Sequence, residues 1–229
     1  MSRARGAPVP DAVIKVGGSL CGDPAALSRL MRALARLARR RTILVVPGGG
    51  GFADEVRRAD RRFAPGDSAA HWMAILAMDQ SAYLMAALAG RAVVVAHARA
   101  EVAPGRLNVL APFAWLRRAD PLPHSWSVTS DSIAAWIARV VRARRLILLK
   151  DVDGRFTRDP KRGGRARLQR EVARDHLPGV VDEYFPRALG RTTRCWIVNG
   201  RHPERVAELM RTGRVYGTEV VALARRRSG

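Results

Sequence analysis

Two glycine clusters, each placed after an apolar run, could bind an anion. The first cluster is Lys15-Val16-Gly17-Gly18-Ser19, and the second is Pro47-Gly48-Gly49-Gly50-Gly51. Glycines at the end of a strand let backbone N–H groups converge on an anion with no Cβ in the way. A helix-compatible stretch follows each cluster, and the N-terminus of a helix attracts the same negative charge. The pair of clusters therefore predicts a phosphate site.

The lysines of this chain are few enough to be informative. Of its 41 basic residues only Lys15, Lys150 and Lys161 are lysines, and the rest are arginines. In so arginine-biased a sequence, a lysine beside a glycine pair favours a site that needs a compact ammonium rather than a planar guanidinium. The alternative is that Lys15 is a lysine by chance.

Composition predicts a globular protein of the cytoplasm. The chain has 229 residues, of which 48% are hydrophobic, and a net charge of +21. Its arginines are scattered without interleaved aromatics, which favours solvated surfaces over a specific nucleic-acid site, although the positive field would attract phosphorylated metabolites. Cys21 and Cys195 have no metal or redox spacing and are expected to be reduced thiols. Residues 1–10 lack the apolar core of a signal peptide, and the apolar stretch 72–88 is interrupted by Asp79 and Gln80, so no membrane span is expected.

Short apolar runs alternate with helical patterns, which predicts an α/β protein with a mainly parallel sheet covered by helices. The expected strands are 12–16, 42–46, 92–96, 107–110, 145–149, 195–198 and 219–222. The expected helices are 24–40, 52–62, 68–88, 132–142 and 203–211. Asp23 is the expected N-cap of the first helix, with Pro24 at its first position. We expect a surface loop or hairpin over 153–164, and short elements mixed with loop over 98–130.

Two common nucleotide motifs do not account for the glycines. The Gly-x-x-x-x-Gly-Lys-Ser/Thr run of a P-loop is missing from the sequence. Gly48, Gly50 and Ala53 satisfy a relaxed Gly-x-Gly-x-x-Ala fingerprint, which also requires an acidic residue at the end of the next strand. Asp67 has about the right spacing but lies between two expected helices, so the Rossmann interpretation fails.

The order of the motifs along the chain is more specific than any one of them. The two glycine clusters are followed by Thr129-Ser130-Asp131-Ser132, by residues 150–160 with the sequence KDVDGRFTRDP, by residues 197–200 and by residues 217–219. In this order and spacing the sequence resembles the amino acid kinase superfamily, which includes acetylglutamate, aspartate, uridylate and isopentenyl phosphate kinases. The resemblance extends from about Val13 to Val221. It implies a three-layer α/β sandwich of the carbamate kinase-like type, formed by one domain over 1–229. An acceptor lobe would span about 11–128 and a nucleotide-binding lobe about 129–229.

A narrower resemblance concerns Phe52-Ala53-Asp54, residues 70–80 and Leu122-Pro123-His124-Ser125-Trp126. These segments are similar to the branch of the family that acts in methanofuran biosynthesis and phosphorylates (5-(aminomethyl)furan-3-yl)methyl phosphate to the diphosphate. The resemblance implies an ATP-dependent kinase with a small phosphorylated metabolite as acceptor. Mg²⁺ would arrive with the nucleotide, no dedicated metal site is expected, and the protein would be a homo-oligomer, a dimer or larger. The alternatives are a uridylate or isopentenyl phosphate kinase, a non-catalytic anion-binding or storage member of the fold, and a nucleic-acid-binding regulator.

The resemblance also implies a role for individual residues. Lys15 would contact the transferring phosphoryl group, with N–H donors from Gly17, Gly18, Gly49 and Gly50. Asp131 would position the catalytic lysine, or else serve as a plain helix N-cap. The expected acceptor-site residues are Gly50, Asp67, His71, Thr129 and Ser130, with a packed or surface histidine as the alternative for His71. The expected nucleotide-binding residues are Lys15, Gly17, Lys150, Asp151, Asp153, Gly154, Phe156 and Asp159, with loop packing as the alternative for Phe156 and a plain turn for Asp159.

One departure from the family pattern bears on the acceptor. Many relatives with a carboxylate acceptor carry a second catalytic lysine in a Gly-Gly-Met-x-x-Lys segment, and the corresponding residues 179–187 contain no lysine. Arg187 or Arg191 could supply that charge, with a different geometry. The missing lysine favours a phosphate monoester as acceptor, which is already ionised near neutral pH and needs no general base. Asp54, Asp60 and Asp67 are candidates to pair with an aminomethyl group.

Overall fold

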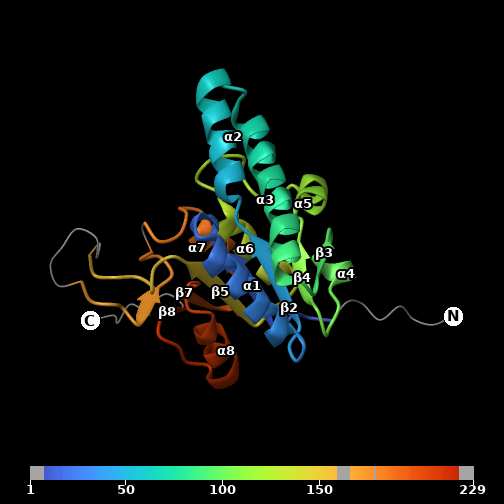
Figure 1. Ribbon diagram of the computed structural model, residues 1–229. Coiled ribbons are helices and arrows are strands. Elements are labelled where there is room, and N and C mark those ends of the chain that lie inside the picture. Colours follow the sequence, from blue (N-terminus) through green and yellow to red (C-terminus); the bar gives the residue numbers. More distant parts are fainter. Residues whose placement is uncertain (1–7, 159–165, 178, 222–229) are drawn as a thin grey trace.

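The core of the molecule is an eight-stranded sheet with the strand order β3-β4-β2-β1-β5-β7-β8-β6 (Figure 1). The computed structural model describes residues 8–158, 166–177 and 179–221. The strands are β1 (Ala12–Val16), β2 (Ile43–Pro47), β3 (Ala92–Val95), β4 (Leu107–Leu110), β5 (Arg145–Lys150), β6 (Glu171–Ala173), β7 (Arg194–Asn199) and β8 (Thr218–Val221). Among the described strand pairs, only β7 and β8 run antiparallel. The predicted mainly parallel sheet is thereby confirmed, and β6 is a strand that the sequence pattern missed.

Helices cover both faces of the sheet and form the outer layers of the sandwich. One apolar cluster joins the sheet to α1 (Pro24–Ala38) and α8 (Pro203–Thr212). The other joins the opposite face to α5 (Phe113–Ala119), α6 (Ser130–Val140) and α7 (Phe185–Ala188). Because side chains alternate along a strand, β1 contributes Ile14 to the first cluster and Val13 to the second. Asp23 caps α1, as expected, by accepting a hydrogen bond from the backbone N–H of Ala26 at 2.9 Å.

Two long helices rise beyond the sheet as an antiparallel pair, α2 (Gly50–Phe63) and α3 (Asp67–Ala89) (Figure 1). α3 is long and apolar enough to pass a composition test for a membrane span. However, its residues Met85 and Ala89 are buried in the cluster with α1, and Ile75 is buried in the cluster with α6. Packing inside the protein therefore explains part of the apolarity of α3, while Leu76, Tyr83 and Leu84 of the same helix are exposed.

Short elements complete the fold. The 3-10 helix η1 (Gly18–Gly22) follows the first glycine cluster, and α4 (Ala98–Glu101) and α5 lie in the segment for which mixed short elements were expected. Phe156 and Leu168 form an antiparallel bridge, and the backbone N–H of Thr157 donates to the Arg167 carbonyl on one side of it. The described residues on either side of 159–165 thus confirm the predicted hairpin.

The strand order predicts a ligand-binding position at the carboxyl end of β1. The chain moves from β1 to β2 on one side, whereas β5 pairs with β1 on the other side. In open parallel sheets, ligands bind outside the carboxyl ends of the strands at such a switch point. The glycine clusters at residues 17–18 and 48–51 follow β1 and β2 directly, so both lie at this end of the sheet.

Candidate active site

Two lysines contact the same buried carboxylate at the carboxyl ends of β1 and β5. The Lys15 ammonium lies 2.9 Å from Asp131 Oδ1, and the Lys150 ammonium lies 2.5 Å from Asp131 Oδ2. Lys15 and Asp131 are each less than 5% exposed. The structure therefore brings together three residues that are widely separated in the sequence.

Strand register explains this convergence. Lys15 pairs with Leu148 in the parallel ladder between β1 and β5, so Lys150 lies two residues further along the neighbouring strand. Side chains two residues apart on a strand lie on the same face of the sheet. Lys15 therefore lies on the same face as Val13, and Lys150 on the same face as Leu148, and both of these apolar residues belong to the cluster with α6. Asp131 is the second residue of α6. The two ammonium groups and the carboxylate thus meet on the α6 face of the sheet.

Burial and neighbouring charge shift the pKa of Asp131 in opposite directions. Burial by itself would raise the pKa of Asp131, but the ammonium groups of Lys15 and Lys150 outweigh it and hold the pKa below its ordinary value. Burial lowers the pKa of Lys150, and the neighbouring charge of Lys15 lowers it further, against the opposing pull of Asp131 and Asp182. Asp131 is consequently a carboxylate at neutral pH.

The two glycine loops pack backbone against backbone beside these lysines. A Cβ added at Gly18 would lie 2.7 Å from the backbone nitrogen of Gly50, and one added at Gly48 would lie 2.7 Å from the backbone nitrogen of Gly18. Gly50 has φ +55°, the left-handed region that favours glycine. The Ser81 hydroxyl of α3 donates to the Gly49 carbonyl at 3.1 Å. Only glycines allow these loops to approach so closely.

The expected donor role of Gly17 is wrong. Its N–H donates to the Leu149 carbonyl at 2.8 Å, which extends the pairing of β1 with β5 and leaves no donor for a phosphate. A Cβ at this position would lie 2.7 Å from the same carbonyl oxygen, so glycine is required there by packing. By contrast, α2 begins at Gly50, and the first N–H groups of a helix have no acceptor within the helix. The N–H groups at the start of α2 are therefore the better-placed donors.

The N-terminus of α6 is held by a residue that sequence reasoning missed, Asp182. One of its oxygens accepts from both the backbone N–H and the hydroxyl of Thr129, at 3.0 and 2.7 Å. The carboxylate also accepts from the backbone N–H and hydroxyl of Ser132. Thr129 is the N-cap of α6, so the alternative that Asp131 serves as a plain cap is wrong. Asp182 fixes the turn of helix that carries Asp131.

The arginines considered as substitutes for a second lysine are not part of this group. Arg187 and Arg191 are both exposed. The guanidinium of Arg187 lies 6.0 Å from the ring centre of Tyr184. The second positive charge beside Asp131 is that of Lys150.

A small cavity connects the glycine loops with α3. It measures about 60 Å³ and includes Gly49, His71, Trp126, Thr129 and Ser130 in its lining. An adjoining hollow is lined by Asp67 together with His71 and Trp126. Thr129 and Ser130 thus line the cavity, Asp67 lines the hollow and His71 lines both, with Gly50 at the neighbouring start of α2.

The walls of this cavity are held by specific contacts. The Trp126 indole N–H donates to Asp60 at 2.7 Å, and the guanidinium of Arg57 lies 5.1 Å from the centre of the Trp126 ring. His71 stacks on His124, with ring centres 4.5 Å apart. His124 in turn contacts Asp120 at 2.8 Å through Nε2. Aromatic rings therefore form much of the surface that an acceptor would meet.

His71 provides a test of this packing through pH. Burial lowers its pKa from 6.5 to about 4, and the charge of His124 adds to the effect against the pull of Asp120. Between these values the unfolded chain binds a proton that the folded protein excludes, so stability falls as the pH drops from 6.5 to 4. We expect His71→Gln to lose less of its free energy of unfolding over this range than the wild type, as measured by urea unfolding at pH 7 and pH 4.5. The exposed control His176→Gln should behave as the wild type, and equal losses in all three proteins would contradict the assignment.

The expected nucleotide-binding stretch lies beside β7 and α8. Asp153 accepts from the Asn199 amide at 3.1 Å and from the Arg205 guanidinium at 2.5 Å. A Cβ at Gly154 would lie 2.4 Å from the Thr218 hydroxyl, so the turn needs a glycine. Phe156 lies in the hairpin bridge described above. Asp159 lies outside the described residues.

A magnesium ion that arrives with a nucleotide needs few protein ligands. Among the residues that the structure describes, no group of three or more His, Cys, Asp or Glu side chains could hold a metal ion. Mg²⁺ in kinase sites is usually held by one or two carboxylates together with substrate phosphates. Asp151, which follows Lys150 directly in the sequence, is the carboxylate that the family resemblance suggests for an indirect contact with such an ion.

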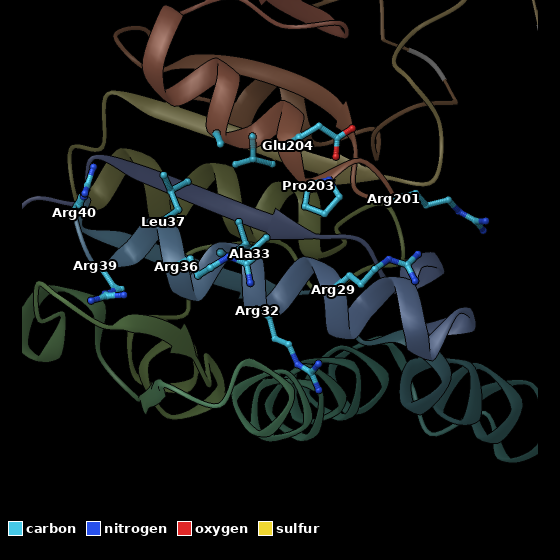
Figure 2. A pocket seen from close by; sticks show the side chains of 13 residues that line it. Arg29, Arg32, Ala33, Arg36, Leu37, Arg39, Arg40, Arg201, Pro203 and Glu204 are labelled. Carbon is cyan, nitrogen blue, oxygen red and sulfur yellow. The ribbon is translucent and has the colours of Figure 1, made fainter.

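A separate groove of about 1070 Å³ lies between α1 and α8 (Figure 2). Six arginines line it: Arg29, Arg32, Arg36, Arg39, Arg40 and Arg201. α1 and α8 cover the face of the sheet opposite to α6, so the groove is not part of the lysine–aspartate group. These arginines gather on one surface, which their scatter along the sequence did not predict.

Comparisons with known proteins agree with this geometry. A family model described as the amino acid kinase family matches residues 12–182. The chain is 31% identical to [5-(aminomethyl)furan-3-yl]methyl phosphate kinase from Methanocaldococcus jannaschii, over 92% of this chain and 98% of that protein. It is 25% identical to uridylate kinase from Methanospirillum hungatei, over 93% of this chain and 95% of that protein.

Solved structures show the same fold. The uridylate kinase from Archaeoglobus fulgidus superimposes with a TM-score of 0.69 at 19% identity, covering 92% of this chain and 99% of that one. An isopentenyl phosphate kinase from T. acidophilum gives a TM-score of 0.60 at 18% identity, covering 91% of this chain and 99% of that one. With the fold, the lysine–aspartate group and the family match in agreement, the chain belongs to the amino acid kinase family and is a phosphotransferase.

Proposed function

We propose that this protein is an ATP-dependent kinase that phosphorylates (5-(aminomethyl)furan-3-yl)methyl phosphate to the corresponding diphosphate. The single observation that carries the proposal is the placement of Lys15 and Lys150 on one buried carboxylate, beside glycine loops that can approach a phosphate. Phosphoryl transfer depends mainly on positioning and on positive charge around the transferring group. The relative from Methanocaldococcus jannaschii supports the choice of acceptor.

The acceptor cavity has features that suit an amine-bearing aromatic phosphate. His71 and Trp126 offer ring surfaces, while Gly49 and Ser130 lie where the cavity meets the glycine loops. Asp67 lines the adjoining hollow. A furan ring would lie between the aromatic side chains, its phosphate toward the glycines and its aminomethyl group toward Asp67.

Three aspartates, Asp54, Asp60 and Asp67, are candidates to pair with the amine of the proposed acceptor. Asp54 is exposed and forms an ion pair with Arg57 at 2.8 Å, away from the cavity lining. Asp60 is engaged by the Trp126 indole N–H. Asp67 is also exposed, but it lines the hollow that adjoins the cavity. We therefore assign recognition of the aminomethyl group to Asp67.

In the proposed reaction, an oxygen of the acceptor phosphate attacks the γ-phosphorus of ATP. The bond from that phosphorus to the β–γ bridging oxygen breaks, and its electron pair stays on ADP. Because the acceptor phosphate is already ionised near neutral pH, no proton has to be removed by a base. Lys15 holds the transferring group, and N–H groups at the start of α2 bind its oxygens. Mg²⁺ bound to the nucleotide supplies further charge neutralisation.

The same proposal covers the wider setting of the enzyme. Residues of about 11–128 would form the acceptor lobe and residues of about 129–229 the nucleotide-binding lobe of one domain. Lys150, Asp151, Asp153, Gly154, Phe156 and Asp159 would contact the nucleotide. The protein would work in the cytoplasm as a dimer or a larger homo-oligomer.

The direct test is ADP release from Mg-ATP with a panel of phosphate monoesters. The panel contains the aminomethyl-furan phosphate, its analogue with a methyl group in place of the aminomethyl group, UMP and isopentenyl phosphate. We expect the highest kcat/KM with the aminomethyl compound. A preference for UMP or isopentenyl phosphate would replace the proposed acceptor, and no turnover with any acceptor would contradict a kinase.

The variant Asp67→Asn sharpens that assay. Loss of a charge-assisted contact is worth about 1.5–3 kcal/mol, so kcat/KM for the aminomethyl compound should fall about tenfold to a hundredfold. The methyl analogue should be used equally well by both proteins. Asp54→Asn, which removes an exposed carboxylate, is the matched control and should leave both substrates unaffected. An equal fall of kcat/KM for both substrates would show that Asp67 does not bind the amine.

A further inference from the structure

We propose that Lys150 is the second catalytic lysine of this enzyme. It would contact the transferring phosphoryl group from the carboxyl end of β5, while Lys15 contacts it from the neighbouring strand β1. The inference rests on the proposed kinase function and goes beyond a general nucleotide-binding role for residues 150–159. It places the second positive charge on a different element from residues 179–187, the segment in which many relatives with a carboxylate acceptor carry a lysine.

The first argument is position. Lys150 and Lys15 lie on adjacent parallel strands, and each ends in an ammonium group held by one oxygen of Asp131. Because each oxygen of the carboxylate binds a different ammonium group, the two positive charges are held apart, one on each side of Asp131. The lysine side chains are mostly buried, with 5% exposure for Lys15 and 16% for Lys150. The side chain of Lys150 is the more exposed of the two, so its ammonium is the more accessible to a ligand.

The second argument is charge balance. Two buried ammonium groups share the single charge of Asp131, which leaves positive charge that a bound anion would neutralise. Asp182 also acts on Lys150, but its oxygens already accept hydrogen bonds from Thr129 and Ser132. A phosphoryl group whose charge spreads during transfer is the ligand that completes this arrangement.

The third argument concerns the segment that lacks a lysine. Residues 179–187 contribute Asp182, which is bound to the N-terminus of α6, and Arg187, whose side chain is exposed. This segment therefore supports the helix that carries Asp131 and brings no cation to it. Lys150 supplies the missing charge from the sheet.

The chemical step is the transfer described above, with Lys150 assigned to one of its charges. As the bond between the γ-phosphorus and the β–γ bridging oxygen breaks, negative charge develops on that oxygen and on the equatorial oxygens. Lys15 and Lys150 would approach these oxygens from the β1 and β5 sides. Neither lysine gains or loses a proton, and the released electron pair remains on ADP.

The test compares Lys150→Gln with the wild type in the ADP-release assay with the aminomethyl-furan phosphate. Loss of one donor to a transition state lowers kcat about a hundredfold to a thousandfold, and we expect that fall with the KM for ATP changed less than threefold. Binding of ADP, which lacks the transferring group, should weaken by less than about threefold by calorimetry. Binding of ADP with aluminium fluoride, a mimic of the transferring phosphoryl group, should weaken in the variant by a similar factor. Arg145→Gln, which removes a positive charge from the opposite end of β5, is the matched control and should retain wild-type kcat.

The outcomes separate this inference from the proposed function. Wild-type protein that turns over none of the acceptors overturns the kinase itself. Turnover in the wild type with an unchanged kcat in Lys150→Gln overturns only the assignment of Lys150, as does a variant whose sole defect is a raised KM for ATP. If Lys150→Gln shows no cooperative unfolding transition, Lys150→Arg decides. Its planar guanidinium should lower kcat about tenfold with wild-type ADP binding, and an unchanged kcat would overturn the assignment.

Discussion

Lys15→Ala is expected to lower kcat about a hundredfold while the protein stays folded. The ammonium of Lys15 lies 2.9 Å from Asp131 and is directed to the end of the sheet where the glycine loops meet. Removing one charge contact that is made in the transition state costs about 3 kcal/mol, which is roughly a hundredfold in rate. Asp131 would keep Lys150 as its partner, so no buried carboxylate is left without a cation.

The measurement is steady-state ADP release with Mg-ATP and the aminomethyl-furan phosphate. Thermal unfolding of the same samples shows whether the variant is folded. Arg41→Ala removes an exposed positive charge just before β2 and is the matched control, with wild-type kinetics expected. Lys15→Ala protein with an unchanged kcat would refute the site.

Asp131→Asn is expected to have the larger effect, because it disturbs both lysines and the fold around them. The substitution leaves two buried ammonium groups without their shared carboxylate, and breaking a buried ion pair in this way typically costs about 3–5 kcal/mol. Activity should fall by at least about a hundredfold, because Lys15 and Lys150 lose the group that fixes their positions.

The pH dependence of this variant has a definite sign. The pKa of Lys150 is already lowered by burial and by Lys15, and loss of the Asp131 charge removes a contact that raised it. As the pH rises from that lowered pKa toward 10.5, the unfolded chain binds more protons than the folded one, so the variant gains stability relative to its value at pH 7. Urea unfolding at pH 7 and pH 9.5 measures this difference. Asp175→Asn, at an exposed position, is the control, and an equal response of both variants would contradict the buried ion group.

Much of the fold was predictable because its central strands carry their own signal. β1 and β4 have the predicted bounds, β5 is one residue longer, and β2 is shifted by one residue, because short apolar runs between breakers define such strands. β6 was missed, because Glu171–Ala173 is three residues long and is a strand only through its pairing with β8. Propensity within so short a segment cannot report a partner that lies some fifty residues away.

In the site, too, some residues could be predicted from the sequence and others could not. The motifs identified Lys15 and Asp131 and their closeness, since family order carries that information. The role expected for Gly17 was wrong because its N–H is consumed by β5, a fact of strand pairing that no motif contains. Asp182 was missed for a related reason, as a lone aspartate has no local signature for a hydrogen bond to a helix fifty residues earlier. Contacts between distant segments are where prediction from a single sequence ends.

The glycine loops have a consequence for the thermodynamics of ligand binding. Where Gly18, Gly48 and Gly50 meet, backbone touches backbone and no side chain intervenes. A side chain that closes on a ligand loses rotamer freedom, at a cost of up to about 2 kcal/mol for a long one. Backbone donors at this contact have no rotamers to lose, and their conformation is already fixed by the neighbouring loop. Phosphate binding here should therefore carry a small conformational-entropy penalty, and most of the ordering that the site requires has been completed when the chain folds.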